Sequence, residues 1–386
     1  MRFASTLATG ARPARSIERT LAELRAALGG AAPDLVTCFL AAEHADQAEE
    51  LVLRLRAAFP RAALLGCTAR SVIGGGRELE DAPGVALLAA SLPGVAIRPF
   101  QLGPAAVAAP GLARAIACEP RDEAQLLVLA DPWSADVDSL LVGLDAELPG
   151  ALRAGGLASG GEGPGASVLF AGDAVRRDGV VGLALRGALC IDTLVAQGCR
   201  PIGQPLFVTR CRGQLLEEVD GRPPLEVLNE LYAEAAPDDQ KLFRHSLFLG
   251  LEMRPERERY GRGDFLIRSM VGVEPESGAL AVAALLRERQ VVQFHLRDAR
   301  SAAADLADRT ARYEHGAEAR GALLFSCLGR GRHLYGEPDH DTRLFRERVA
   351  PVPIGGFFCN GEIGPVGGTT FLHGYTSSFG IFRPTL

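Results

Sequence analysis

The sequence has few of the residue types and patterns that indicate a particular class of function. Lys241 is the single lysine among 41 basic residues, and the chain has one tryptophan and three methionines. Acidic residues number 47, so the net charge is −6 and there is no basic excess to favour a nucleic acid as partner. The longest apolar stretches, such as residues 84–95, are interrupted by proline or glycine and are too short to span a bilayer. We therefore expect neither nucleic-acid binding nor membrane insertion.

Sequence motifs for metals and for common catalytic sites are also missing. The sequence has no CxxC pair, no histidine at metal-ligand spacing, and no GxSxG, HExxH or phosphate-loop motif. The N-terminal segment lacks the apolar core of a secretory signal. We expect a cytoplasmic protein without metal or cofactor, in which eight cysteines stay reduced. These cysteines lie at positions 38, 67, 118, 190, 199, 211, 327 and 359.

A repeated pattern organises much of the chain. Three copies of a unit follow one another, each with a strand, a helix, a glycine-rich loop and a hairpin. The predicted first strands are 35–41, 126–130 and 322–327; the helices are 43–59, 134–148 and about 339–349; the hairpins are 85–90 with 95–101, 167–171 with 180–186, and 370–375 with 377–382.

The pattern changes after GRPP at residues 221–224, which interrupts both helix and strand. Strands are predicted at 265–273, 280–287 and 291–296, before a helix at 299–313. With 386 residues, 47% of them hydrophobic, the chain is long enough for two domains, which we divide into 1–222 and 223–386. The fold class is α/β or α+β, with two lobes of mostly antiparallel or mixed sheets faced by helices.

The stretch GGFFCNGEIGPVGGTTFLHGY, residues 355–375, is the strongest candidate for a site. Glycine permits close backbone approach, so a loop this rich in it can fold around a small ligand. Cys359, Asn360 and Glu362 lie on this loop, and burying Glu362 without a partner would be costly. The alternative is a glycine-rich connection before a buried hairpin, which needs no ligand.

The strand that follows this loop adds a second group of candidates. Side chains alternate along a strand, so Phe371, His373 and Tyr375 are predicted to share one face. They could form one wall of a small-molecule pocket. A histidine between two aromatic residues is also typical of a satisfied core histidine, and both interpretations stay open.

Six motifs of the chain carry a resemblance to a known family. They are GCTARSVIGGG at 66–76, QGCRPIG at 197–203, GDFLIRSMVGVEPESGALAV at 263–282, VQFHLRDARSAAADL at 292–306, FSCLGRG at 325–331 and GFFCNGEIGPVGGTTFLHGYTSSFGIF at 356–382. Together they resemble the FIST family, named for F-box and intracellular signal transduction proteins. The C-terminal motif is the most specific, and the resemblance extends over nearly the whole chain.

The resemblance implies a sensory module of bacterial signalling proteins that binds small ligands such as amino acids. In that family such modules stand beside kinase, cyclase or chemotaxis output domains. Residues 1–222 resemble the N-terminal FIST domain, and residues 223–386 resemble the C-terminal one. We expect the stand-alone form, which would act through a separate signalling effector protein.

An amino-acid ligand needs an acceptor for its ammonium group and a cation for its carboxylate. Glu362 and Arg330 are the matching pair if the loop that Cys327 opens faces the loop after Cys359. Arg330 could instead be a solvated loop arginine. Residues 338–341, Pro-Asp-His-Asp, could suggest a metal site, but acids behind a proline are typical of a helix N-terminus. The predicted ligand-binding residues are Cys327, Arg330, Cys359, Asn360, Glu362, His373 and Tyr375.

Two other classes of function remain. A thiol-dependent enzyme would use Cys359 or Cys327 with His373 and Glu362, and the glycine-rich loop would offer backbone donors to an oxyanion. A protein-partner scaffold would explain the repeats but leaves the Cys-Asn-Gly-Glu loop without a purpose. We favour a binding module without catalytic residues.

Overall fold

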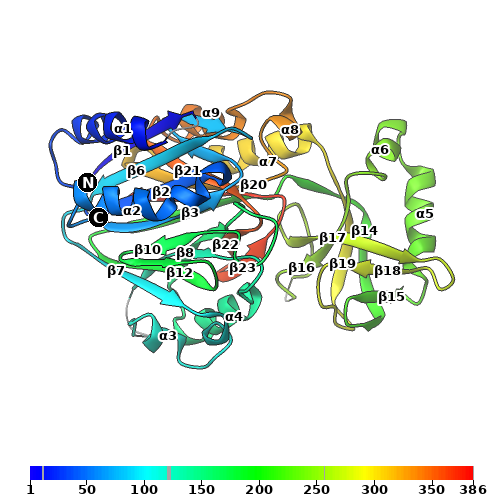
Figure 1. Cartoon of the computed structure of the whole chain (residues 1–386). Helices are drawn as coiled ribbons and strands as arrows, with labels where there is room; N and C mark the ends of the chain where they lie inside the picture. Colours follow the sequence, from blue (N-terminus) through cyan, green and yellow to red (C-terminus); the bar gives the residue numbers. More distant parts are fainter. Residues whose placement is uncertain (11–12, 120–122, 256, 386) are drawn as a thin grey trace. The chain divides into compact units, whose positions relative to one another are not determined.

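The computed structural model describes residues 1–10, 13–119, 123–255 and 257–385, and the chain divides into two compact units (Figure 1). The first unit comprises Met1–Val195, Ala307–Leu372 and Thr376–Leu386, and the second comprises Ala196–Leu306 with His373–Tyr375. The second unit is therefore an insertion in the chain of the first. The predicted division of the sequence at residues 222 and 223 stays a prediction.

The first unit contains three six-stranded mixed sheets, which confirms the predicted α/β class. The first sheet has the order β1 (Arg2–Thr9), β6 (Gly84–Ser91), β2 (Leu35–Ala41), β3 (Ala63–Ala69), β10 (Leu169–Ala171), β11 (Ala174–Arg176). The second has β23 (Thr369–His373), β22 (Glu362–Val366), β9 (Leu152–Leu157), β8 (Gln125–Ala130), β12 (Val180–Gly187), β7 (Val95–Leu102). The third has β13 (Cys190–Ala196), β24 (Ser377–Arg383), β20 (Gly321–Cys327), β21 (Ile354–Cys359), β4 (Val72–Gly74), β5 (Arg77–Leu79).

Each sheet is built on the same parallel pair, so the predicted threefold repeat is confirmed. The pairs are β2 with β3, β8 with β9, and β20 with β21, joined by α2 (Ala48–Ala58), α4 (Val137–Glu147) and α9 (His340–Arg348). The equivalent glycines Gly66, Gly155 and Gly356 stand opposite Cys38, Val128 and Leu324. At each glycine an added Cβ would lie 1.8–1.9 Å from the facing carbonyl oxygen. Only glycine fits at these three positions.

The hairpins of the repeat are exchanged between copies. The pair β4–β5 of the first copy lies in the third sheet, β10–β11 of the second copy in the first sheet, and β22–β23 of the third copy in the second sheet. The predicted hairpins 85–90 with 95–101, 167–171 with 180–186, and 370–375 with 377–382 are therefore wrong in their pairing. Their strands exist, but the two members of each pair belong to different sheets. The prediction pairs strands that are neighbours in the sequence, whereas each of these strands pairs with a strand of another segment.

One apolar cluster takes residues from all three sheets and forms the centre of the unit, with Phe39, Leu129 and Phe325 among its members. Helices cover the outer faces. In the first copy, α1 (Pro13–Ala27) and α2 cover the first sheet, and in the second copy, α3 (Leu112–Ala115) and α4 cover the second sheet (Figure 1). The remaining helices of this unit are α8 (Arg332–Tyr335) and the 3-10 turns Ala42–Gln47, Pro104–Ala106 and Gly316–Glu318.

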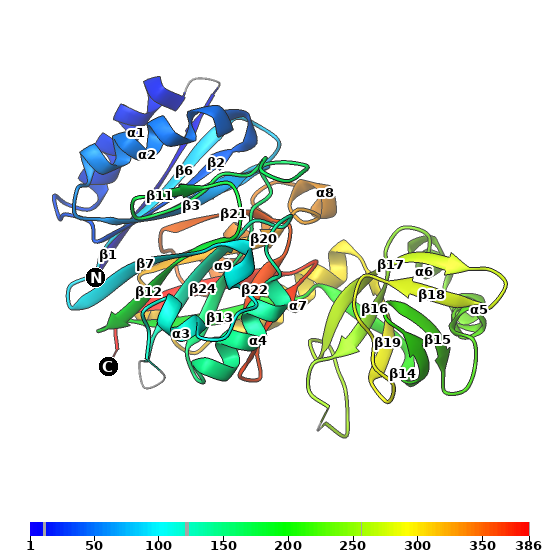
Figure 2. The same ribbon diagram turned by 60° about the horizontal axis from the view of Figure 1, so that its bottom comes forward.

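The second unit is a closed barrel that the sequence pattern did not suggest (Figure 2). Its strand order is β14 (Cys199–Arg212), β15 (Leu215–Val219), β18 (Ala279–Val282), β17 (Phe265–Glu274), β16 (Leu247–Glu252), β19 (Val291–Arg297). The helices α5 (Pro224–Glu234) and α6 (Pro237–Leu242) belong to this unit, and α7 (Ala299–Ala311) runs from it into the first unit. Among the described residues no helix is long and apolar enough to cross a membrane.

Candidate functional site

The three hairpin exchanges begin at equivalent points, where the second strand of each parallel pair ends. The connections from β3 to β4 and from β21 to β22 are two residues each, 70–71 and 360–361. The connection from β9 to β10 covers the 11 residues 158–168. Counted from the equivalent glycines, Arg70, Ser159 and Asn360 occupy the same position in the three copies.

Hydrogen bonds join these three strand ends directly. The Ser159 hydroxyl accepts from the Arg70 backbone N–H at 3.0 Å and donates to the Phe358 carbonyl at 2.5 Å. The Asn360 backbone N–H donates to the Leu157 carbonyl at 3.2 Å, and its Nδ2 donates to the Ala158 carbonyl at 3.4 Å. The carboxyl ends of all three parallel pairs thus meet at one place in the first unit.

Exposed side chains surround this meeting point. Arg70 and Asn360 are exposed, while Ser159 is 7% exposed. The indole of Trp133, which is 51% exposed, donates to the Gly161 carbonyl at 3.4 Å and so lies against the connection 158–168. We call Arg70, Trp133, Ser159 and Asn360 the strand-end site. It combines a cation, an aromatic ring, a hydroxyl and an amide.

Four of the predicted site residues lie at or beneath this place. Cys327 and Cys359 are register partners at the ends of β20 and β21, and Asn360 is the next residue. Glu362, at the start of β22, pairs with Gly156 and is completely buried, and its Oε2 accepts from the Thr376 N–H at 3.1 Å. Only Asn360 among them is exposed.

The Cys359 thiol is held in its protonated form. The side chain is 0% exposed. Burial, together with the nearby Glu362 carboxylate and the thiols of Cys67 and Cys327, raises the pKa of Cys359 well above its ordinary value. A thiol is a poor nucleophile compared with a thiolate, so this environment disfavours covalent catalysis by Cys359.

Arg330 has an internal partner that the sequence did not indicate. It is 0% exposed, and its Nε and Nη2 donate to the two carboxylate oxygens of Asp341 at 2.7 and 3.2 Å. Burial alone would raise the pKa of Asp341, but the charge of Arg330 and the hydrogen bonds from His340 and Ser377 hold this pKa below its usual range. The charge of Arg330 is therefore compensated inside the protein.

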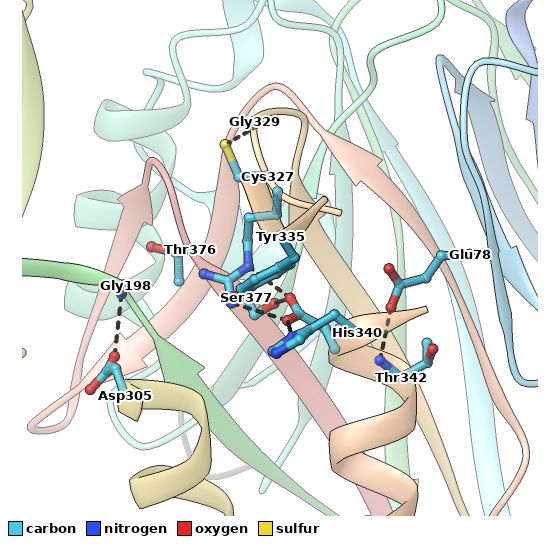
Figure 3. A network of polar contacts seen from close by, with 12 residues as sticks. Glu78, Gly198, Asp305, Cys327, Gly329, Tyr335, His340, Thr342, Thr376 and Ser377 are labelled. Atoms are coloured by element: carbon cyan, nitrogen blue, oxygen red, sulfur yellow. Dashed lines mark hydrogen bonds and ion pairs between the residues drawn. The ribbon is translucent and has the colours of Figure 1, made fainter. Parts of the chain in front are cut away.

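A second carboxylate completes this polar layer under α9. Figure 3 shows Tyr335, His340 and Ser377 gathered together, with Glu78 beside Thr342. The Glu78 Oε1 accepts from the Thr342 N–H at 2.8 Å, at the N-terminus of α9. The predicted helix start is confirmed, but Glu78 of a distant strand supplies this carboxylate, and the Asp339 side chain makes no capping bond. Burial, and then the neighbouring Asp341, raises the pKa of Glu78 to about 8.

His373 and Tyr375 belong to the second unit. His373 is buried, at 2% exposed. The Tyr375 hydroxyl and the Ser269 hydroxyl lie 2.7 Å apart, the Tyr375 ring lies 4.2 Å from that of Phe248, and the Arg297 guanidinium lies 5.2 Å from its centroid. The predicted pocket that would combine them with the loops at 327–332 and 355–366 stays a prediction.

An open cavity of about 430 Å³ lies elsewhere in the first unit, at the start of β3. Its lining includes Arg61, Phe100, Gln101 and Asp173, and none of the predicted site residues. Among the residues that the structure describes, no group of three His, Cys, Asp or Glu side chains could hold a metal ion.

The sequence analysis does not predict Arg70, Trp133 and Ser159, because the glycine-rich stretch with the most polar candidates, residues 355–375, lies in the third copy. The signal that could have found them is the repeat itself. Aligning the copies on Gly66, Gly155 and Gly356 places ARS, ASG and CNG at equivalent strand ends. In this alignment Arg70 and Ser159 are the equivalents of Asn360.

Comparison with protein families finds two adjacent matches that cover most of the chain. The model of the FIST N domain matches residues 34–222, and the model of the FIST C domain matches residues 224–365.

Relatives of full length occur in mycobacteria. An uncharacterised protein of Mycobacterium tuberculosis strain H37Rv is 36% identical over 384 residues, which cover 99% of this chain and 100% of the relative. An uncharacterised protein of Mycobacterium bovis is 36% identical over 363 residues, or 93% of each chain.

Two solved structures of cyanuric acid hydrolases, one from A. caulinodans, are similar at 12% and 10% identity. They cover 99% and 100% of both chains, each with a TM-score of 0.34. At this score the similarity supports no argument about the ligand or the chemistry of this chain.

Proposed function

Because this chain belongs to the FIST family, whose domains are sensory modules of signal transduction, we propose that it binds a small polar metabolite such as an amino acid and signals through a separate effector protein. It does so in the cytoplasm and without turning the ligand over. The ligand occupies the strand-end site of the first unit.

The observation that supports this proposal is the convergence of three strand ends from three copies of the repeat. In α/β proteins, ligands bind outside the carboxyl ends of the parallel strands, where the connections diverge. Here the Ser159 hydroxyl links Arg70 to Phe358, and Asn360 bonds to Leu157 and Ala158. Polar groups from three distant segments are thereby fixed around one point.

Arg70 is suited to bind the carboxylate of a ligand. Its Nε donates to Asp81 Oδ1 at 2.6 Å, but the two side chains are 62% and 66% exposed. An exposed ion pair contributes about 0–1 kcal/mol, so exchanging Asp81 for a ligand carboxylate costs little. Arg330, which was predicted for this role, already has the buried partner Asp341.

The other predicted residues divide by their exposure. Asn360 can contact the ligand with its amide, and half-buried Cys327 lies one strand away from it. Cys359, Glu362 and Arg330 lie beneath as buried support, and we propose that they shape the strand ends. The alternative of a Cys359 enzyme is disfavoured because burial keeps this thiol protonated.

The proposal is tested by a thermal-shift screen of the full chain against the twenty amino acids. A ligand at a hundred times its Kd adds about 2.7 kcal/mol of stability. Charge-assisted hydrogen bonds contribute about 1.5–3 kcal/mol, so Arg70→Gln should weaken binding by about tenfold or more. Arg61→Gln is the matched control, because Arg61 is an exposed arginine before the opposite end of β3. Equal loss in both variants, or loss in neither, would contradict the location of the site.

A further inference from the structure

The three connections at the strand-end site differ in length. Two consist of two residues, while the connection 158–168 has 11, four of them glycine. It runs from the second sheet to the first, with the Val168 N–H donating to the Thr68 hydroxyl at 2.9 Å. We call residues 158–168 the long connection. Its four glycines give it more backbone freedom than either of the two short connections.

A buried carboxylate lies beside the base of the long connection. Asp131 directly follows β8, and the carbonyl of the preceding Ala130 accepts from the Ala158 N–H at 2.9 Å. Side chains alternate along a strand, so Asp131 follows Leu127 and Leu129, which belong to the central core. Asp131 is 0% exposed.

One oxygen of the Asp131 carboxylate, Oδ2, is hydrogen-bonded. Ser134 donates from its hydroxyl to Asp131 Oδ2 at 2.6 Å, and Ser134 Oγ itself accepts from the Gly179 N–H at 2.9 Å. Asp131 Oδ1 is buried and has no hydrogen-bond partner among the residues the structure describes. The same holds for the hydroxyl of Ser167, at the far end of the long connection.

A buried carboxylate oxygen without a partner is costly, and a cationic donor removes that cost. The equivalent positions in the other two copies are Ala41 and Cys327, which carry no charge of this kind. The end of the first strand in each parallel pair therefore does not require an acidic residue. The Asp131 side chain is held in place by Ser134 with one oxygen left to accept.

We propose that Asp131 binds the protonated amine of the ligand, and that the long connection opens to admit it. This inference rests on the proposed function and narrows its ligand class to zwitterions, with Arg70 taking the carboxylate and Asp131 the ammonium group. The ammonium donates a hydrogen bond to Oδ1, and no covalent bond forms. Trp133, which contacts the long connection at Gly161, senses the opening.

The first test needs no variant. Each amino acid that stabilises the wild-type chain is compared with its α-hydroxy acid, which keeps the carboxylate and replaces the ammonium by a hydroxyl. We expect the hydroxy acid to bind at least tenfold more weakly. Equal binding of the two would overturn the role of Asp131 while leaving the proposed function intact.

The second test uses Asp131→Asn, which keeps the shape of the side chain and removes its charge. We expect this variant to lose at least tenfold in affinity for the amino acid and to bind the hydroxy acid as the wild type does. Asp136→Asn is the control, because Asp136 caps α4 in the same loop through the Ser139 N–H and has both of its carboxylate oxygens bonded to Ser139.

The two proposals fail in different ways. Loss of amino-acid binding in Arg70→Gln but not in Asp131→Asn would overturn the inference alone. Binding that neither variant affects would overturn both the inference and the strand-end site, and so would a wild-type chain that none of the twenty amino acids stabilises. If Asp131→Asn does not fold, the comparison of amino acid with hydroxy acid still decides the question.

Discussion

The first and third copies of the repeat fill the same layer, between sheet and helix, with opposite chemistry. In the first copy, Leu40 faces Val85 across β2 and β6, and both belong to an apolar cluster under α1 and α2. In the third copy the equivalent pair is Ser326 and Ser377, which are equally buried. Around them lie a buried arginine and two buried carboxylates, from Arg330, Asp341 and Glu78.

The apolar layer of the first copy indicates that this unit can fold without a polar layer. The same strand-helix-strand unit forms on an apolar layer in the first copy. Buried ion pairs are often no more stabilising than apolar side chains of similar volume, so the polar layer of the third copy carries a cost in desolvation. What it provides is a fixed position for the segment 327–341, which starts beside the strand-end site.

The largest effect on stability is expected at the buried ion pair of Arg330 and Asp341. Arg330→Met leaves the Asp341 carboxylate buried without its cation, and we expect a loss of about 3–5 kcal/mol in the free energy of unfolding. The double variant Arg330→Met with Asp341→Leu should recover much of this loss, because it makes the third copy resemble the first. Urea unfolding of the three proteins measures both effects. A double variant as unstable as the single one would show that the polar layer is required by the fold.

The pH dependence of stability tests the polar layer through Glu78, which lies in β5, the strand that the first copy contributes to the third sheet. The folded-state pKa of Glu78, about 8, lies above the ordinary glutamate value. The folded chain therefore binds more protons than the unfolded chain between about pH 4.5 and 8, and this contribution to stability is lost as the pH rises through 8.

Glu78→Gln should flatten the pH profile of the free energy of unfolding across that range, by an amount on the order of a few kcal/mol. Unfolding in urea at pH 5, 6, 7 and 8 provides the profiles. Parallel profiles for the wild type and the variant would show that Glu78 does not titrate in this window.

What the copies share can be tested at the equivalent glycines. Gly66→Ala and Gly356→Ala should each cost about 1–3 kcal/mol or more, because the added Cβ would meet a backbone carbonyl at 1.9 Å. Gly163→Ala is the control, since nothing lies within 4 Å of its added Cβ. Thermal and urea unfolding should rank both core variants well below the control. A tolerated alanine in one copy would mean that its parallel pair is less closely packed.

The smallest changes in stability are expected for the two serines of the polar layer, Ser326 and Ser377. Ser326 Oγ has no hydrogen-bond partner among the described residues, so Ser326→Ala should change stability by less than about 1 kcal/mol and in the stabilising direction. Ser377 donates to Asp341, and Ser377→Ala should destabilise by about 1–3 kcal/mol. Matched unfolding curves decide this, and equal effects of the two changes would remove the distinction.

The sequence predicted the local parts of this structure well. The strands at 35–41, 126–130 and 322–327 and the start of α9 follow from hydrophobic pattern and helix-start signals, which act over a few residues. The exchange of hairpins between copies could not be predicted, because it depends on which distant edge completes each sheet. For the same reason Arg330 was assigned to a ligand, since its partner Asp341 is fixed only once β20, α9 and β24 pack together.

The candidate site was predicted in part. Asn360 was identified from its own loop, whereas Arg70, Ser159 and Asp131 come from other copies and are not close in sequence. The repeat was visible, and the equivalent glycines would have aligned it. The exposure of the arginine side chains could not be predicted, because no pattern in the sequence distinguishes exposed Arg70 from buried Arg330.

The most direct test of the strand-end site uses the single tryptophan of the chain as a reporter. Trp133 lies at that site, half exposed and bonded to the long connection. Titration with an amino acid that stabilises the chain should change its emission in a saturable way, with the Kd of the thermal-shift series and a tenfold higher Kd in Arg70→Gln. An amino acid that stabilises the chain without altering Trp133 emission or responding to Arg70→Gln would place the ligand elsewhere and contradict the account.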